Sequence, residues 1–350
     1  MNRRSSILMS LLMAVLMTLS ACGGADGDAA ASGDDTHTLT DMEGRDVEVP
    51  REVDRVVTLG SVPVINGFLF ALGEGDVIVN GLPDFALGGR WQYQYVFAPG
   101  IEEQPQTQTA DGAPKVEDIL ELEPDVVLTM NADLVEPLEE VGLDVMVLQW
   151  RDATDVTEVV DLLGTLLGRE ERAEEYSRYF TQTTDEVADI VADVPADERR
   201  SALYLSPEAM TRPHLIADWW IDQAGGQSAT EGSTEEVLPL NVEQIIGWDP
   251  DVIFVSSPDE VEAVYQDPRF APLSAVAEQE VYAVPIAAHT WGNRTSEQPL
   301  TVYWAASKLY PDLISADDVV GEVQDFYASI FHTELDDDQV AEIAAGTVGE

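Results

Sequence analysis

The chain has 350 residues and a formal net charge of −50 at pH 7, because 67 Asp and Glu residues stand against 17 Lys and Arg residues. Such a charge argues against nucleic acid as a partner and against electrostatic attraction to anionic lipid. The hydrophobic share of 45% is enough for buried cores, and the length indicates about two domains. The acidity favours a salt-loving or salt-tolerant host, the alternative being an acidic secreted protein from an ordinary host.

The N-terminus has the pattern of an export signal. Arg3 and Arg4 give a basic start, and an apolar run covers Ile7–Leu19. The two arginines suggest twin-arginine export, but Ser5 and Ser6 fit that pattern poorly, so Sec and twin-arginine export both stay open. This run is shorter than the roughly 20 residues of a membrane-crossing helix, so it indicates a signal peptide over residues 1–21. The following Leu-Ser-Ala-Cys resembles the bacterial lipobox, which implies cleavage before Cys22 and lipidation of its thiol. As the only cysteine, Cys22 also excludes an intrachain disulfide.

A tether and a first α/β lobe are predicted next. Residues 22–37 are rich in Gly, Ala, Ser and Asp, which is typical of a flexible linker. Strands then alternate with helices, and this order predicts a lobe with a mainly parallel sheet over residues 38–168. Its expected elements are a hairpin at Leu39–Val49, a strand at Arg55–Leu59, a helix at Val62–Leu72, a strand at Asp76–Leu82, a polar-aromatic loop at Pro83–Gly100, a helix and strand within Lys115–Thr129, a helix at Ala132–Val141 and a strand at Asp144–Trp150.

A long helix and a second lobe complete the predicted chain. Apolar residues recur at helical spacing through Thr154–Val194, and the glycines near 168 predict a break before a helix at Arg169–Val191. Residues 169–194 would then be a stiff bridge to a second α/β lobe over residues 195–334. The acidic residues 335–350 are expected to fray. The second lobe's expected elements are strands at Ser201–Leu205, Asp251–Ser257 and Glu280–Pro285 and helices at His214–Ala224, Glu297–Tyr310 and Asp317–Phe331.

One sequence unit occurs twice. Lys115–Thr129 reads KVEDILELEPDVVLT, and Asn241–Ser256 reads NVEQIIGWDPDVIFVS. An acid near the start, a Pro-Asp pair and an apolar β-branched strand recur at one constant offset. The offset is longer than the period of a solenoid, which is roughly 20–50 residues. The repeat therefore indicates two similar lobes.

These features together resemble one protein family over about Leu39–Phe331. They are the lipobox, the tether, RVVTLGS with its helix, the two repeat units and the central helix. The family comprises the substrate-binding lipoproteins of ABC importers for iron–siderophore complexes, haem and cobalamin. The resemblance implies two Rossmann-like lobes with mainly parallel sheets joined by one long α-helix, and a ligand held between them. We expect a monomer that serves an ABC permease and its ATPase and reaches the membrane only through the lipid on Cys22.

The resemblance also implies how the protein meets its permease. In this family a glutamate on each lobe, in the helix before the PDVV-type strand, docks onto permease arginines. Glu117 and Glu243 match these positions. An acid in a first helical turn suits the helix dipole and can stay exposed for a planar contact with Arg. The alternative is an acid that only stabilises the helix start, since Asn241 and Gln244 also form a capping-box pattern.

Candidate ligand-binding residues follow the predicted strands. Ligands of open α/β sheets bind beyond the carboxyl ends of the strands. Arginine there suits anionic groups, and aromatic rings suit planar chelates or macrocycles. For each Trp the alternative is core packing, and for the histidines it is a structural role. The candidates are Ser61, Arg90, Trp91, Tyr93, Tyr95, Trp150, Arg212, His214, Trp220, His289, Trp291 and Arg294.

The sequence favours a binding protein over an enzyme. G-x-G-x-x-G, P-loop, G-x-S-x-G and H-E-x-x-H motifs are all absent. A lipoprotein that senses or adheres without transport is a further alternative. No cofactor or resident metal is expected, and arginine beside aromatic residues favours an anionic ferric siderophore as ligand. Haem, which would use an axial Tyr or His, and cobalamin are alternatives, whereas the bulky loops argue mildly against oxoanions.

Overall fold

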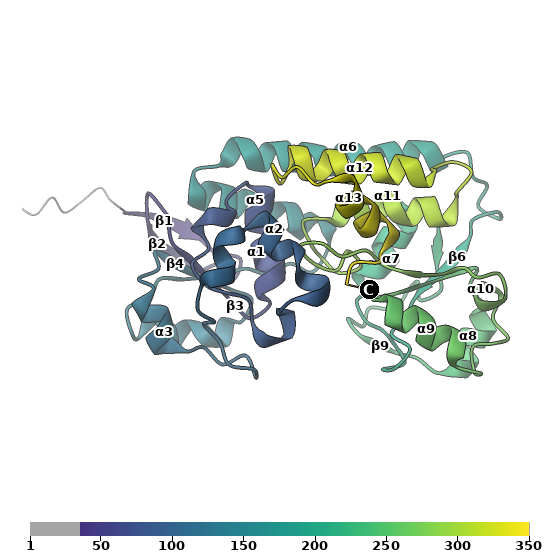
Figure 1. Ribbon diagram of the computed structural model, residues 1–350, viewed down its shortest axis with the longest axis horizontal. Helices are drawn as coiled ribbons and strands as arrows, with labels where there is room; N and C mark the ends of the chain where they lie inside the picture. The colour runs from purple at the N-terminus through teal and green to yellow at the C-terminus, as the bar shows by residue number, and fades with distance from the viewer. Residues whose placement is uncertain (1–35, 350) are drawn as a thin grey trace, which may run out of the picture. The chain divides into compact units, whose positions relative to one another are not determined.

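Two parallel sheets organise the fold, which the computed structural model describes for residues 36–349 (Figure 1). The expected signal peptide and Cys22 lie outside these residues. The first sheet holds β3 (Val56–Leu59), β4 (Val126–Thr129) and β5 (Val145–Val147). The second sheet has the order β11 (Val281–Ala283), β10 (Val252–Val255), β6 (Ser201–Tyr204) and β8 (Gln227–Ser228). The central strands are continuous apolar runs, as expected of sheets covered on both faces. The predicted α/β class with mainly parallel sheets is confirmed.

The remaining strands are short. The predicted hairpin forms from β1 and β2 and turns at Gly44, whose φ is 78°. A small antiparallel pair, β7 with β9, lies in the second half of the chain. The bounds are β1 Thr36–Thr40, β2 Asp46–Pro50, β6 Ser201–Tyr204, β7 Thr211–Arg212, β8 Gln227–Ser228, β9 Leu238–Pro239, β10 Val252–Val255 and β11 Val281–Ala283.

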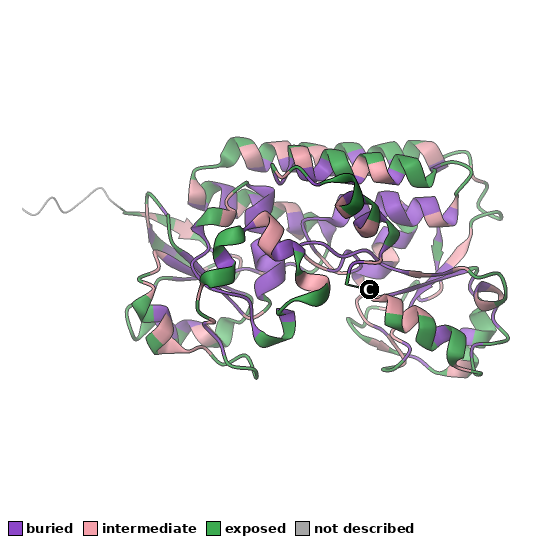
Figure 2. Ribbon diagram, in the orientation of Figure 1, coloured by how far each residue is buried: buried purple, intermediate pink, exposed green. Residues whose placement is uncertain are grey.

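Helices α5 (Ala153–Leu167) and α6 (Glu170–Val191) form where helical periodicity predicted them. Gly168, with φ 64°, ends α5. Gly164 lets the two helices approach, because a Cβ there would lie 2.7 Å from the Ala173 side chain. Helix α6 packs along α11 (Gln298–Leu309), which is buried on nearly all sides (Figure 2). The Tyr176 hydroxyl donates to the Ser296 carbonyl oxygen at 2.9 Å at this contact.

The other helices complete both halves. They are α1 (Val62–Ala71), α2 (Tyr93–Phe97), α3 (Val116–Glu121), α4 (Val135–Glu139), α7 (Ile216–Gln223), α8 (Val242–Trp248), α9 (Pro258–Gln266), α10 (Ser274–Ala277), α12 (Ala316–Ser329) and α13 (Asp337–Ala345). Single 3₁₀ turns lie at Gly75–Val77, Asp84–Ala86, Gly89–Trp91, Pro99–Glu103 and Ala132–Leu134. The loop predicted at Pro83–Gly100 thus contains two of these turns, α2 and the start of a third turn.

The sequence repeat is also a structural repeat. Helices α3 and α8 precede β4 and β10. The Asp125 carboxylate accepts from the N–H groups of residues 54 and 55, each at 2.9 Å, at the start of β3. The Asp251 carboxylate accepts from the Ser201 N–H at 2.7 Å, at the start of β6. Glu123 and Asp249 share the same left-handed turn, with φ 44° and 45°. The aspartate of each Pro-Asp pair therefore fixes the neighbouring strand.

The strand predicted at Asp76–Leu82 is wrong. Only Ile78 bridges to Val56, and the segment begins as a 3₁₀ turn. The Asn80 side chain takes the place of a strand, because its Oδ1 accepts from the Thr58 N–H at 2.8 Å and its Nδ2 donates to Thr58 O at 3.2 Å. A buried side-chain amide thus satisfies the free edge of β3.

The expected fraying of the acidic tail is also wrong. Asp336 and Gln339 form a capping box at the start of α13, and Gly346 ends the helix with φ 73°. One face of this segment is buried, with Ile343 fully inaccessible. The Tyr93 hydroxyl donates to the Gln339 carbonyl oxygen at 3.2 Å. Charge alone suggested a solvated tail, whereas the apolar residues between the acids recur at helical spacing.

Replacing Ile343 with Ala is expected to destabilise the protein by about 2–4 kcal/mol, because it empties a fully buried site. Chemical denaturation of purified protein measures the effect. Ala341→Ser, on the exposed face of the same helix, should change the free energy of unfolding by less than about 0.5 kcal/mol. Equal, small effects of both changes would contradict the packed tail.

Candidate functional site

A cavity of about 120 Å³ lies where loops from the two halves meet. Ser61, Met130 and Trp150 follow β3, β4 and β5, so the first sheet presents the carboxyl ends of its strands. The opposite wall comes from the loop after β7 and the loop after β11. The lining residues are Ser61, Val64, Met130, Trp150, His214, His289, Asn293 and Arg294. Five of the twelve predicted ligand-binding residues are therefore brought together.

Arg294 connects the walls of the cavity. Its Nη1 and Nη2 donate to the two carboxylate oxygens of Glu236 at 2.8 and 2.7 Å, a two-point pair. Its Nε donates to the carbonyl oxygen of Arg151, just after β5. The Trp150 indole N–H donates back to the Arg294 carbonyl oxygen at 3.1 Å. The direction of the guanidinium is thus fixed by the first half of the chain and its charge is balanced by the second.

Two neutral histidines complete the polar wall. Burial lowers the pKa of His289 to about 4, against a weak opposing effect of its contact with Thr290 O. Burial also lowers the pKa of His214, despite the Glu236 carboxylate 3.3 Å from its Nδ1. The Arg294 hydrogen bonds keep the pKa of Glu236 below its usual value. At neutral pH the cavity is therefore lined by one cation, which is paired with the neighbouring Glu236 anion, and by two uncharged imidazoles.

Buried polar groups hold the loop that carries His289. The Glu297 carboxylate accepts from the N–H groups of Ala288 and His289 at 3.0 and 2.9 Å and from the Tyr327 hydroxyl at 2.5 Å. Burial raises the pKa of Glu297 to about 7, although these hydrogen bonds act to lower it. Gln94 Nε2 donates to the Ala288 carbonyl oxygen at 2.6 Å. Sequence reasoning missed Glu297, and its only signal is a glutamate at the start of an otherwise apolar helix.

An apolar rim borders the cavity. Met130 lines it with 38% of its surface exposed, and Phe85 is 60% exposed. Trp91 lies between Phe85 and His289, with ring centroids 6.2 and 5.4 Å away. Exposed aromatic groups beside a polar cavity are typical of a ligand-binding surface. Of the predicted residues in the 88–95 loop, Trp91 lies next to the site, because its ring contacts the cavity residue His289.

The other residues of that loop do not line the cavity. Arg90 donates to the Ser256 carbonyl oxygen at 2.6 Å, and burial lowers its pKa. Tyr93 is buried against α13, where its hydroxyl donates to Glu342 and its pKa is raised. Tyr95 is half-buried against the core. Arg90 and Tyr93 thus form hydrogen bonds with a backbone carbonyl and with helix α13. The composition of the loop could not reveal these partners.

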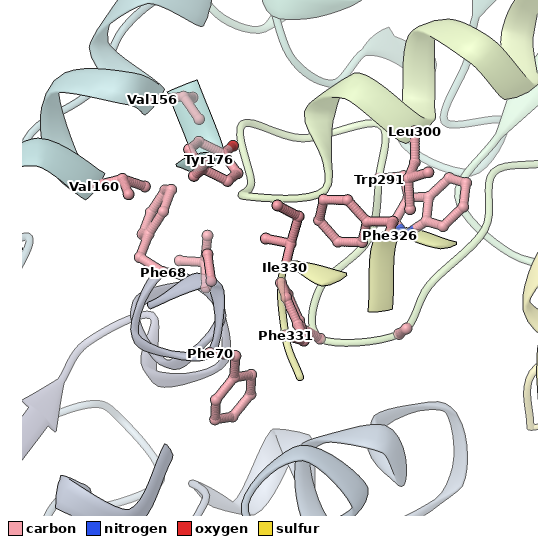
Figure 3. Packing of buried hydrophobic residues seen from close by; sticks show 14 of the residues in the cluster. Phe68, Phe70, Val156, Val160, Tyr176, Trp291, Leu300, Phe326, Ile330 and Phe331 are labelled. Atoms are coloured by element: carbon pink, nitrogen blue, oxygen red, sulfur yellow. The ribbon is translucent and has the colours of Figure 1, made fainter. Parts of the chain in front are cut away.

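Three further candidates are core residues. Trp220 and Trp291 are fully buried, and Figure 3 shows Trp291 packed beside Leu300 and Phe326. The Trp220 indole N–H donates to the Gly292 carbonyl oxygen at 3.3 Å, so it supports the binding loop from behind. Arg212 is buried too, donates to the Glu235 carbonyl oxygen at 2.6 Å and pairs with Asp218 at 3.6 Å. For the two tryptophans the alternative of core packing is the one that the structure supports.

The two predicted docking glutamates occupy equivalent exposed positions. Glu117 and Glu243 are each the second residue of their helix, α3 and α8. Neither has an ion-pair partner among residues 36–349. One turn later, Leu120 and Ile246 are 40% and 42% exposed. Each half thus presents an acid beside an exposed aliphatic residue in the same register.

Two kinds of feature are absent from the part of the chain that the structure describes. Between residues 36 and 349 no group of three or more His, Cys, Asp and Glu side chains is arranged to hold a metal ion. No helix in the same range is long and apolar enough to span a membrane.

The fold and the cavity define a solute-binding protein with two parallel sheets, one long connecting helix and a site between the sheets. The chain belongs to the periplasmic binding protein family, which matches residues 69–288. It is the solute-binding component of an ABC importer, and its relatives are extracytoplasmic binding proteins, not enzymes. This confirms the family resemblance and the expectation of a non-enzymatic role.

Three comparisons show the range of relatives. The molybdate-binding protein MolA of Haemophilus influenzae is 23% identical over 335 residues, with 87% of this chain and 93% of that protein covered. The iron(3+)-hydroxamate-binding protein YxeB of Bacillus subtilis is 24% identical and shares 52% of this chain and 53% of its own. A periplasmic solute-binding protein of Veillonella parvula shares the fold with a TM-score of 0.75, at 22% identity, over 88% of this chain and 96% of its own.

Proposed function

We propose that the protein captures a metal chelate with anionic oxygens, a ferric siderophore in the first place, and delivers it to the permease. The observation that carries this proposal is the exposed apolar rim above a small polar cavity. A bare inorganic ion gains nothing from Phe85 and Trp91, whereas the organic part of a chelate can cover them.

The cavity volume fits part of such a ligand. Pockets for whole drug-sized ligands measure about 300–1,000 Å³, so a cavity of about 120 Å³ takes only part of a chelate. That space accepts one chelating group, with its oxygens near Arg294 and the Ser61 hydroxyl, which makes no capping bond to its own helix. The remaining chelate then lies over the rim, and only modest closure is needed to cover it.

A compact oxoanion is the second candidate. The cavity has room for one, Ser61 lies at the start of α1, and a relative covered over 93% of its length is named for molybdate. These observations favour an oxoanion, whereas the bulky loops in the sequence argued mildly against one. Haem and cobalamin are further chelates of the same class, and neutral His289 or His214 would suit haem iron.

The experiment is a binding panel of ferric siderophores, haem, cobalamin and molybdate, read by tryptophan fluorescence. Trp91 and Trp150 at the site should give saturable quenching with a ferric siderophore and no turnover. Quenching by molybdate alone would select the oxoanion, and a Soret band in protein from its own host would select haem. No response to any of the four would reject the proposed ligand class.

We also propose the remaining parts of the cellular role. Lipidation of Cys22 anchors a monomer outside the cell membrane, and the residues between Cys22 and β1 tether it. The functional parts are then an N-terminal lobe at 38–168, a bridging helix at 169–194 and a C-terminal lobe at 195–334. The permease contacts both lobes through the surfaces around Glu117 and Glu243, as the exposed acid and aliphatic pairs support.

A further inference from the structure

Glu236 occupies the place at which an anionic ligand would meet Arg294. The Arg294 side chain is only 10% exposed. Both terminal nitrogens of its guanidinium group, the fork formed by Nη1 and Nη2, donate to the Glu236 carboxylate. A buried cation needs such a partner, because an uncompensated charge in this position is costly. The fork cannot turn away either, since Nε is held by the Arg151 carbonyl oxygen.

Glu236, in contrast, can move away from Arg294. The Glu236 side chain is 52% exposed, and among residues 36–349 its hydrogen bonds and ion pairs are with Arg294 and His214 alone. It lies on the exposed segment between Gly232, with φ 86°, and β9. A carboxylate at such a position regains water when it turns outward, so its release costs little.

We propose that Glu236 is an internal surrogate for the ligand, which the anionic oxygens of the incoming solute displace from Arg294. Resting on the proposed anionic ligand, this exchange makes Glu236 a specificity-determining residue. A ligand must bind the Arg294 fork better than a carboxylate does. Strongly anionic ligands satisfy this condition, whereas neutral complexes leave Glu236 in place and bind only through the rim.

The test compares E236Q with the wild type and with E235Q, which removes the neighbouring exposed acid. The probes are a triply anionic ferric tris-catecholate, a neutral ferric tris-hydroxamate and molybdate. E236Q should bind the two anionic probes about tenfold more tightly, because Gln competes less well for the cation. Its affinity for the neutral complex should change less than about twofold. E235Q should match the wild type throughout.

Two results would overturn the exchange. Weaker binding of the anionic probes by E236Q would make Glu236 a direct ligand contact, and unchanged binding would show that it stays on Arg294. If neither protein binds any probe, the proposed function fails. A ligand-free measurement then judges the internal pair separately: the NMR-derived pKa of His214 should fall in E236Q but not in E235Q, because Glu236 raises that pKa. An equal pKa in all three proteins would remove the contact on which the inference rests.

Discussion

Replacing Arg294 with Met is expected to weaken binding of an anionic ligand by about two orders of magnitude. The substitution keeps a flexible side chain but removes every donor of the fork, including the bond to the Arg151 carbonyl oxygen. Loss of one partner of a buried, hydrogen-bonded charge pair costs about 2–5 kcal/mol, and each factor of ten in affinity corresponds to about 1.4 kcal/mol. Titration of tryptophan fluorescence with the best ligand of the panel measures the change.

Matched variants separate charge from packing. Arg269→Met removes an exposed arginine that pairs with Asp267, so affinity should stay at the wild-type value. Arg294→Lys keeps the charge without the planar fork and should lie between Met and wild type. The double variant R294M/E236Q should recover part of the loss, because the unpaired Glu236 no longer repels the anion. Wild-type affinity in R294M would place the ligand elsewhere.

The sequence could predict the parts of the site that follow from strand topology. Ser61 and Trp150 come directly after buried strands, so the rule that ligands lie beyond the carboxyl ends places them correctly. The repeat likewise predicted two similar halves, since Asp125 and Asp251 each fix a neighbouring strand. At these positions the local residue pattern agrees with the fold, so a single sequence was enough to predict them.

Long-range partners could not be predicted in the same way. Glu236 is one of 67 acids, and nothing in its neighbourhood distinguishes it before the fold brings Arg294 within 2.8 Å. Arg90 has the residue type expected of an anion site, yet its Nη2 donates to a backbone carbonyl far along the chain. Similarly, Trp220 fills the core because a buried indole found an acceptor in Gly292. Such outcomes depend on contacts between distant segments and leave no local pattern.

Reversing both docking acids, in the variant E117R/E243R, is expected to reduce transport to background while ligand affinity stays unchanged. Both carboxylates are exposed, have no ion-pair partner among residues 36–349 and do not line the cavity. If they meet permease arginines, the change places cation against cation at both contacts, and the neighbouring Leu120 and Ile246 lose their apolar match as well. Uptake of labelled ligand in cells, with Kd of the purified protein, measures the two effects separately.

The matched control is E170R/D317R, which reverses two exposed acids in the first turns of α6 and α12. Both double variants lose the favourable interaction of an acid with the helix dipole, which is worth about 0.3–1 kcal/mol at each site. Their stabilities should therefore fall equally, and both proteins should stay folded, since domains are stable by about 5–15 kcal/mol. Only E117R/E243R should lose transport. If its ligand affinity fell in proportion to uptake, the two glutamates would belong to the fold or the cavity, because a surface that only docks has no means of changing Kd.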